Sequence, residues 1–180
     1  MGGVMNQSVT IKQLKTEEIT AEVFADLAEI LRDAITHGAS VGWVNVPSSA
    51  EAVAYWDDVK DRVAAGSTLL LVAEDKDRIV GTVQLQLTSK ENGYHRGEVA
   101  RLLVHSAVRR QGIGRRLMTA VETKAWALDL ALLILDTREG DPSQQLYAKL
   151  GWQLAGVIPQ FARSTDGSLA GTALMYKLKN

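Results

Sequence analysis

The sequence predicts a single α/β domain built on a mixed, mostly antiparallel sheet. Short apolar or alternating runs, typical of strands, are separated by longer stretches in which apolar residues recur at helical spacing. Three strand-like runs in the middle of the chain are joined by short turns and indicate an antiparallel meander. After the meander, helices and strands alternate, as in mixed α/β folds. The 180 residues fit one domain, expected at 9–180 after a flexible N-terminus at 1–8.

The first third of the chain predicts one strand and two helices. In order, the elements are a strand at 9–14, a helix at 19–36, a loop at 39–47 and a helix at 52–65. Gly38 suits the end of the first helix, because glycine accepts the left-handed conformation that often follows a helix. Ser48 and Glu51 have the spacing of a capping box, in which each side chain satisfies a free backbone N–H at a helix start.

The rest of the chain predicts the meander, two further helices and three further strands. The meander comprises strands at 68–74, 78–88 and 94–104, and beyond it lie a helix at 115–128, a strand at 131–135, a helix at 142–150 and strands at 153–163 and 169–177. The strand at 131–135 is wholly apolar, as expected for a central strand covered on both faces. Pro142 suits the first turn of its helix, where its missing N–H has no intrahelical partner to lose.

The most informative segment is the loop Arg109–Gly114, between the last meander strand and the helix after it. It carries two arginines and two glycines, Gly112 and Gly114. The first turn of a helix has free N–H groups and partial positive charge, and glycines let a ligand approach that backbone closely. The loop therefore predicts a binding site for a phosphate-bearing ligand, a pyrophosphate in particular.

Several interpretations of this loop compete, and the plainest is a glycine turn with solvated arginines. A P-loop requires Lys-Ser or Lys-Thr after its second glycine, whereas Gly114 is followed by Arg115. A dinucleotide-binding fingerprint requires a third glycine where this chain has Leu117. The pattern Arg-x-x-Gly-x-Gly instead resembles the acyl-CoA pyrophosphate loop of the GNAT N-acetyltransferase superfamily.

The resemblance to the GNAT superfamily extends over nearly the whole chain. The element order is that of the GNAT fold, and the segment 145–152, Gln-Leu-Tyr-Ala-Lys-Leu-Gly-Trp, looks like the closing motif of the superfamily. The implied fold has helices on both faces of the sheet and a splay between the central parallel strands. A further resemblance, to the tabtoxin-resistance type of acetyltransferase, rests on segments 37–43, 65–71, 135–137 and 166–169. One departure is Gly140, where many GNAT enzymes carry an asparagine that contacts the cofactor.

The resemblance implies acetyl-CoA as the co-substrate and assigns residues to it. Its pyrophosphate falls to Arg109, Arg110, Gln111, Gly112, Ile113, Gly114 and Arg115. Its pantetheine arm is expected to add like an extra strand to the backbone of Leu102, Leu103 and Val104, whose side chains belong to the core. A backbone N–H near Leu103 is the candidate that polarises the thioester carbonyl. The acceptor pocket is expected to be closed by a loop that contains Gly38, Ala39 and Ser40.

Three side chains are candidates for acid–base chemistry. Glu98 lies midway along the last meander strand, and Asp136 ends the apolar strand that follows. Each is a candidate base, directly or through a water, and the tabtoxin-resistance type carries acids at the matching positions. Their alternative roles are an ion pair of Glu98 with Arg101 and a cap by Asp136 for the next loop or helix. Tyr147 of the closing motif is the candidate acid that protonates the coenzyme A thiolate, with packing against a neighbouring tryptophan as its alternative role.

Composition restricts the remaining classes of protein. The net charge of −1 argues against a general binder of nucleic acid or of anionic membranes. The chain has no cysteine, which excludes disulfides, cysteine nucleophiles and cysteine-based zinc sites. No metal site is expected, because the three histidines are far apart in sequence. Neither a signal peptide nor a membrane-spanning stretch is visible, so a cytoplasmic location is the default expectation.

Together these observations predict a cytoplasmic, acetyl-CoA-dependent N-acetyltransferase that works by direct attack in a ternary complex. The expected acceptor is a small-molecule amine, with an amino-acid-like toxin or antibiotic as the candidate that the resemblance suggests. Two alternatives stay open, a protein N-terminal or lysine acetyltransferase and a non-catalytic acyl-CoA-binding sensor. The sequence also leaves open whether the chain forms a homodimer.

Overall fold

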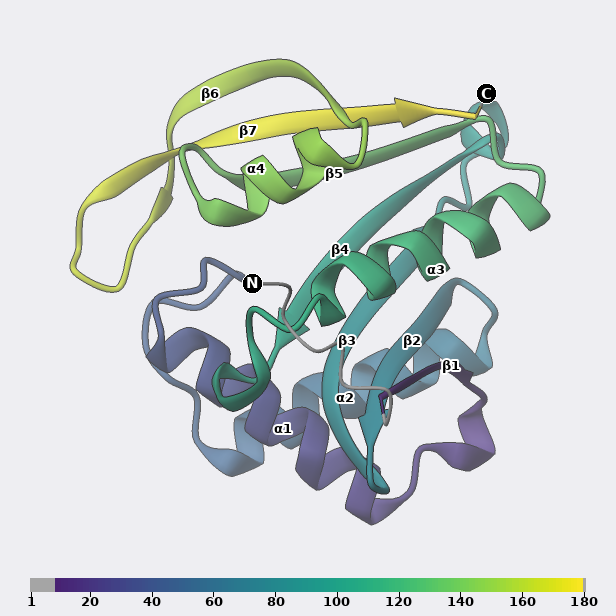
Figure 1. The fold of residues 1–180 in the computed structure, drawn as a ribbon, viewed down its shortest axis with the longest axis vertical. Helices are drawn as coiled ribbons and strands as arrows, with labels where there is room; N and C mark the ends of the chain where they lie inside the picture. The colour runs from purple at the N-terminus through teal and green to yellow at the C-terminus, as the bar shows by residue number, and fades with distance from the viewer. Residues whose placement is uncertain (1–8, 180) are drawn as a thin grey trace.

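The computed structural model describes residues 9–179, so the predicted flexible N-terminus at 1–8 lies outside the described residues. In chain order the main elements are β1 (Thr10–Leu14), α1 (Ala21–Thr36), α2 (Ser49–Ala64), β2 (Thr68–Asp75), β3 (Arg78–Leu87), β4 (Arg96–Val104), α3 (Ile113–Ala127), β5 (Leu132–Arg138), α4 (Pro142–Lys149), β6 (Gln153–Arg163) and β7 (Leu169–Leu178). The strands form one seven-stranded sheet in the order β1-β2-β3-β4-β5-β7-β6. As Figure 1 shows, α1 and α2 cover one face of the sheet and α3 and α4 the other, which confirms the predicted architecture.

Two hydrophobic clusters occupy the opposite faces of the sheet. Alternate residues of β2 divide between them: Leu70 and Val72 pack with α1 and α2, whereas Leu71 and Ala73 pack with α3. A period of two with apolar residues on both faces is that of a strand buried on both sides. The apolar run that identified this strand in the sequence therefore reflects burial on both faces, between the two helical layers.

The predicted start signal of α2 is confirmed, although the helix runs Ser49–Ala64 rather than over the predicted 52–65, and the start of α3 shifts as well. The capping box of α2 is confirmed, because the N–H of Glu51 donates to Ser48 Oγ at 3.2 Å and the N–H of Ser48 donates to Glu51 Oε2 at 2.8 Å. α3 begins at Ile113 rather than at the predicted residue 115. The reason is Gly112, which turns the chain at φ 80° and whose carbonyl accepts the N–H of Arg116. The second glycine of the loop motif therefore lies inside the helix.

Strand β5 is longer than the predicted strand at 131–135. Its ladder with β7 continues through the pair Asp136–Leu174 to the pair Arg138–Thr172, so the strand extends past its apolar run. Asp136 consequently lies within β5 and does not cap a loop or a helix, which corrects that alternative. The N-cap residue of α4 is Asp141.

The parallel neighbours β4 and β5 are paired over only three residue pairs. These pairs are Arg96–Leu132, Gly97–Leu133 and Glu98–Ile134. Beyond Glu98 the two strands separate, and within the described part of the chain no other strand pairs with this side of β4. Figure 1 shows the resulting V between β4 and β5. The splay that the resemblance implied is therefore present.

A bulge in β4 changes which side chains share a face beyond Glu98. The register with β3 shifts between Thr82 and Gln84, and Arg101 has a left-handed φ of 55°. The extra residue breaks the alternation of the strand. Val99 therefore packs in the α3 cluster, whereas Leu103 packs in the α1–α2 cluster.

Candidate active site

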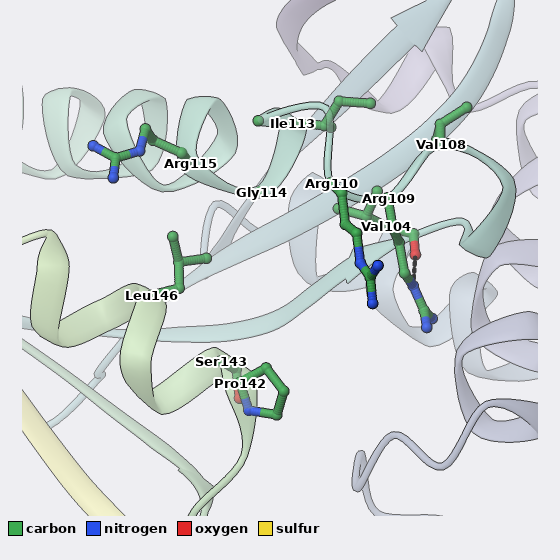
Figure 2. Close-up of a pocket in the computed structure, with 11 residues that line it drawn as sticks. Val104, Val108, Arg109, Arg110, Ile113, Gly114, Arg115, Pro142, Ser143 and Leu146 are labelled. Atoms are coloured by element: carbon green, nitrogen blue, oxygen red, sulfur yellow. Dashed lines mark hydrogen bonds between the residues drawn. The ribbon is translucent and has the colours of Figure 1, made fainter. Parts of the chain in front are cut away.

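A cavity of about 370 Å³ lies where the end of β4 meets the N-terminal ends of α3 and α4. Its lining comprises Val104, Val108, Arg109, Arg110, Gly112, Ile113, Gly114, Arg115, Pro142, Ser143 and Leu146. In Figure 2, residues of α4 face the arginines of the β4–α3 loop (residues 105–112) across this site. All the residues predicted to hold the pyrophosphate line the cavity except Gln111, and Val104 lines it as well.

The two glycines of the loop have different roles. At Gly112 an added Cβ would meet nothing within 4 Å, but the left-handed φ of 80° strains any residue with a side chain. At Gly114 the backbone is ordinary, and an added Cβ would stand 3.5 Å from Leu146 Cδ2 in the wall of the cavity. Gly112 thus sets the shape of the turn, and Gly114 keeps space open beside the first turn of α3.

The arginines of the loop also differ. Arg109 is held in place, because its Nε donates to the backbone oxygen of Val104 at 3.0 Å and its Nη2 lies 3.8 Å from Asp33 Oδ2. Arg110 and Arg115 are exposed, and neither makes a hydrogen bond or ion pair among the described residues. Their charges, together with the positive end of α3, fit a pyrophosphate. The donors and the open backbone at this helix start therefore match the chemistry of the predicted cofactor.

Glu98 and Asp136 lie close together where β4 and β5 begin to separate. Glu98 pairs with Ile134 across the two strands, and Asp136 follows on the same face of β5. Partial burial and the negative charge of Asp136 raise the pKa of Glu98, and the positive charge of Arg101 opposes this rise. Asp136 accepts a hydrogen bond from Thr172 Oγ1 at 3.2 Å. A carboxylate with a raised pKa is a better base near neutral pH than an ordinary glutamate.

Tyr147 is the residue of α4 whose side chain is buried in the α3 cluster. Its ring centroid is 6.2 Å from that of Trp152, so the packing role weighed from the sequence is present. Burial, reinforced by the charges of Asp141 and Asp136, raises the pKa of Tyr147 and keeps the phenol protonated at neutral pH. Tyr147 itself does not line the cavity, whereas its neighbour Leu146 does. Its role as the acid stays a prediction.

The backbone segment predicted for the pantetheine arm is only partly exposed to the cavity. Val104 lines the cavity, Leu102 packs against the α3 cluster and Leu103 is buried in the α1–α2 cluster. The expectation that these side chains belong to the core is thereby confirmed for Leu103. Their backbone borders the splay, on the side of β4 that lacks a partner strand among the residues described.

The loop between α1 and α2 (residues 37–48, the α1–α2 loop) contains the residues predicted to close the acceptor pocket. The carbonyl of Gly38 accepts a hydrogen bond from Arg138 Nη1 at 3.1 Å, and Ala39 packs against the α1–α2 cluster. A second cavity, of about 160 Å³, is lined by Ser40, Gly42, Trp43, Val44, Ala162 and Arg163. The loop therefore lies against the ends of β5 and β6, on the open side of the V.

Sequence reasoning missed a polar cluster beside this loop. The hydroxyl of Tyr55 accepts hydrogen bonds from Arg101 Nε and from Gln84 Nε2, both at 3.1 Å. Arg101 also lies 3.4 Å from where a Cβ on Gly42 would stand. The bulge that directs Arg101 to this face depends on a left-handed φ at an arginine, which no residue pattern signals. The sequence had shown Arg101 only as a partner for Glu98.

The residues that α4 contributes to the larger cavity were also missed. Pro142, Ser143 and Leu146 line it, and Thr137 Oγ1 lies 2.7 Å from Ser143 Oγ, which ties the helix to β5. Pro142 signalled a helix start, but only the tertiary fold brings that start beside α3. Gly140, the departure from the GNAT pattern, has a left-handed φ of 77°. This conformation, which glycine favours, begins the turn into α4.

Two structural observations bear on metals and membranes. The part of the chain that the structure describes brings together no group of three or more His, Cys, Asp or Glu side chains suited to a metal ion. No helix among residues 9–179 is long and apolar enough to cross a membrane.

Comparison with known proteins gives a family and several structural relatives. The model of the acetyltransferase (GNAT) family matches residues 25–152. An uncharacterized N-acetyltransferase from the hisH-hisA intergenic region of Azospirillum brasilense is 30% identical over 133 residues, which are 73% of this chain and 76% of that protein.

Solved structures share the fold at lower identity. A ribosomal-protein-alanine N-acetyltransferase from Brucella melitensis superposes with a TM-score of 0.79 at 21% identity, over 94% of this chain and 99% of the other. A Salmonella typhimurium protein solved with its cofactor acetyl-CoA superposes with a TM-score of 0.77 at 19% identity, over 97% of this chain and 95% of the other. A phosphinothricin acetyltransferase from Sinorhizobium meliloti, in complex with acetyl-CoA, superposes with a TM-score of 0.76 at 19% identity, over 96% of this chain and 89% of the other. These likenesses confirm the fold class.

Proposed function

The chain belongs to the GNAT acetyltransferase family, and from this premise we propose that it transfers acetyl groups from acetyl-CoA to the amine of a small molecule. Acetyl-CoA is the co-substrate of this family. The observation that carries the proposal is the course of β4. This strand ends at the larger cavity with Val104, and it places Glu98 beside Asp136 where the splay begins. One strand thus connects a cofactor site with a candidate base.

Binding of the cofactor falls to the β4–α3 loop and the start of α3. Arg110 and Arg115 supply positive charge, and the first turn of α3 supplies free N–H groups for the pyrophosphate. Acetyl-CoA supplies the acetyl group as a reactive thioester. The pantetheine arm is placed along the unpaired side of β4, where an extended chain can add to a strand edge.

The side chains at the splay then handle the protons. Glu98, with its raised pKa, takes a proton from the acceptor ammonium directly or through a water, and Asp136 is the alternative base. The neutral amine attacks the carbonyl carbon, so that the C–N bond forms as the C–S bond breaks. The new amide nitrogen then loses its second proton to water, and Tyr147 regains from water the proton that it gives to the thiolate. Tyr147, whose phenol stays protonated, donates a proton to the leaving thiolate. Direct attack requires both substrates to be bound together and forms no acetyl-enzyme.

An amino-acid-like acceptor, such as a toxin or an antibiotic, is the finer part of the proposal. Two guanidinium groups flank the α1–α2 loop, that of Arg101 beside Gly42 and that of Arg138 at Gly38. Arg138 Nε is buried and has no hydrogen-bond partner among the described groups. A carboxylate or phosphinate on the acceptor would satisfy such donors. The resemblance to the tabtoxin-resistance type and the phosphinothricin acetyltransferase among the structural neighbours agree with this class.

A panel of acceptors tests the proposal. Thiol release from acetyl-CoA is measured with α-amino acids and with the matched amines that lack the carboxylate. We expect turnover to favour the amino acids, and Arg138→Gln to raise their KM but not that of the amines. Arg62→Gln, whose partner is Asp58 on the same helix, is the matched control. Intersecting initial-rate lines indicate a ternary complex, whereas parallel lines would contradict direct attack.

The same panel separates the alternatives. Peptides with free N-termini and peptides with internal lysines are included, and preferred turnover of either would favour a protein acetyltransferase. Binding of acetyl-CoA without turnover of any amine would favour a sensor. Co-purified ligand identified by mass spectrometry gives an independent indication of the acceptor.

The proposal also includes a homodimer and a cytoplasmic location. Exposed apolar side chains gather on β6 and β7, namely Leu154, Val157, Ile158, Phe161, Leu169 and Leu174. A patch of this kind is typical of a protein–protein contact. Sedimentation of Phe161→Asp and of the unmodified protein tests it, with a shift to monomer expected for the variant. The location follows from the co-substrate, which is a metabolite of the cell interior.

A further inference from the structure

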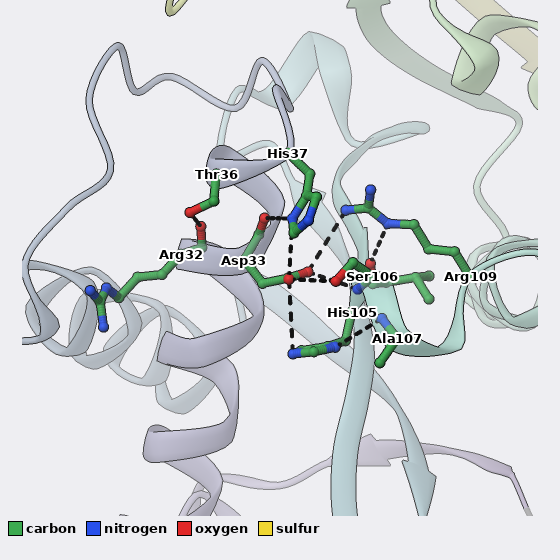
Figure 3. A network of polar contacts seen from close by, with 9 residues as sticks. Arg32, Asp33, Thr36, His37, His105, Ser106, Ala107 and Arg109 are labelled. Carbon is green, nitrogen blue, oxygen red and sulfur yellow. Dashed lines mark hydrogen bonds and ion pairs between the residues drawn. The ribbon is translucent and has the colours of Figure 1, made fainter.

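The carboxylate of Asp33, in the last turn of α1, is the centre of a polar network that the proposed chemistry does not use. It accepts the N–H and the hydroxyl of Ser106, each at 2.7 Å. His37 Nδ1 lies 3.2 Å, Arg109 Nη2 3.8 Å and His105 Nε2 4.0 Å from its oxygens. Figure 3 shows these side chains converging on Asp33 from α1 and from the β4–α3 loop.

One side of this network anchors the cofactor site. Ser106 begins a short 3₁₀ turn, Ser106–Val108, which leads directly into Arg109. Arg109 is held between Asp33 and the carbonyl of Val104. Two hydrogen bonds and a cationic neighbour therefore fix the segment that delivers the arginines and Gly112 to the cavity.

The other side of the network holds the α1–α2 loop. His37 is the C-cap of α1 and the first residue of that loop, and its Nδ1 lies 2.8 Å from the backbone oxygen of Asp33. The loop's far end is fixed by the preceding residue of α1: Arg32 Nε donates to the carbonyl of Pro47 at 3.0 Å, and Arg32 Nη1 donates to Ser49 Oγ at 3.2 Å. The C-terminal end of α1 therefore contacts both ends of the α1–α2 loop and also Ser106, which anchors the β4–α3 loop.

The neighbours of Asp33 stabilise its negatively charged form. Burial alone would raise its pKa, but the hydrogen bonds from Ser106 and the charges of His105 and His37 outweigh burial and hold the pKa below its usual value. The side chain of Asp33 is about 9% exposed. A partly buried, charged and multiply bonded group of this kind fixes its neighbours strongly, because leaving them unpaired is costly.

We propose that Asp33 is a positioning residue that couples the cofactor loop to the α1–α2 loop, so that binding at one orders the other. The inference rests on the proposed function in that residues 109–115 hold the coenzyme A pyrophosphate. Ordering of the β4–α3 loop fixes Ser106 and Arg109, and these residues in turn fix Asp33. Asp33 then fixes the end of α1, where the α1–α2 loop begins. By linkage, an ordered acceptor loop strengthens cofactor binding by the same factor.

The test is hydrogen exchange with coenzyme A as the probe, combined with calorimetry. In the unmodified protein we expect coenzyme A to slow amide exchange both in residues 105–115 and in residues 38–46. Asp33→Asn keeps the shape but removes the charge, and we expect it to abolish the second effect and to raise the Kd of coenzyme A on the order of tenfold. Ser106→Ala removes the hydroxyl bond, leaves α1 intact and should show the same two changes at smaller size.

Asp26→Asn is the matched control. Asp26 is a buried carboxylate on the same helix that accepts the N–H of Ile79 at 2.8 Å and pairs with Arg78, away from both loops. We expect it to lower thermal stability without changing the Kd or the exchange pattern. Equal effects of Asp26→Asn and Asp33→Asn would overturn the coupling, as would protection confined to residues 105–115 in the unmodified protein. Absence of protection at 105–115 would instead refute the cofactor site, and the coupling with it.

Discussion

The proposed cofactor region and the proposed acceptor region are built from different kinds of structure. The cofactor region uses the backbone of a helix start, one left-handed glycine and arginines at fixed spacing, all within residues 109–115. The acceptor region uses side chains from several separate elements: Tyr55 on α2, Arg101 on β4, Arg138 on β5 and the α1–α2 loop. A shared ligand group can be recognised by one short segment, whereas a variable ligand is recognised by side chains that can change independently.

The largest expected effect on activity comes from changing Glu98, the candidate base that faces the acceptor amine. Glu98→Gln keeps the size of the side chain and removes the base, so we expect kcat to fall by about 10²–10⁴-fold. The Kd of acetyl-CoA, measured by calorimetry, should stay unchanged because the cofactor cavity does not include Glu98. Unchanged kcat would move the assignment to Asp136, for which Asp136→Asn is the equivalent variant.

Tyr147→Phe separates chemistry from packing. The ring and its contact with Trp152 remain, and only the hydroxyl is lost. Since a thiolate is a good leaving group, we expect kcat to fall by roughly ten- to a hundredfold with little change in cofactor affinity. Steady-state kinetics with the best acceptor provide the measurement. Equal kcat values for the two proteins would leave Tyr147 with a packing role only.

Gly112→Val tests the cofactor half alone. The side chain strains the left-handed turn and projects beside the phosphate site, so we expect the Kd of acetyl-CoA to rise about tenfold or more. Gly167→Val is the matched control, because Gly167 also has a left-handed φ of 86° with nothing within 4 Å of an added Cβ, but lies in the β6–β7 hairpin. We expect both variants to lose a similar amount of stability. Only Gly112→Val should also lose affinity for acetyl-CoA. An unchanged Kd in a folded Gly112→Val protein would remove this loop from the site.

The smallest expected effect is a shift in the pH dependence of activity, which tests the electrostatic interaction between Asp136 and Glu98. The charge of Asp136 raises the pKa of Glu98, so Asp136→Asn should lower that pKa. A base must be deprotonated to act, so activity is lost as pH falls through its pKa. The acid limb of the kcat/KM profile should therefore move to lower pH in Asp136→Asn. A limb that stays in place would show that Glu98 does not set it.

The contrast between the two regions also explains how far the sequence could be interpreted. The β4–α3 loop was predicted because its requirements are local: a helix start, glycine at a left-handed φ and nearby positive charge. Arg101 could not be predicted, since its direction depends on a bulge in the pairing of β4 with β3. Asp33 and Ser106 are far apart in the chain, and nothing near either residue signals the contact. Helix and strand positions followed from periodicity, whereas the extension of β5 came from its ladder with β7.

The separation of β4 from β5 also gives the protein a strand edge in its interior. An unpaired edge on a surface is a template for other chains, and natural sheets protect such edges against aggregation. Beyond Glu98 the free side of β4 lies inside the V and faces β5. An extended ligand needs only a single strand edge, whereas a sheet of another protein would have to enter the V to pair with it. Under the proposed function, this edge offers backbone hydrogen bonds to the pantetheine arm and is shielded from other proteins, so a variant that opens the V should lose solubility along with affinity.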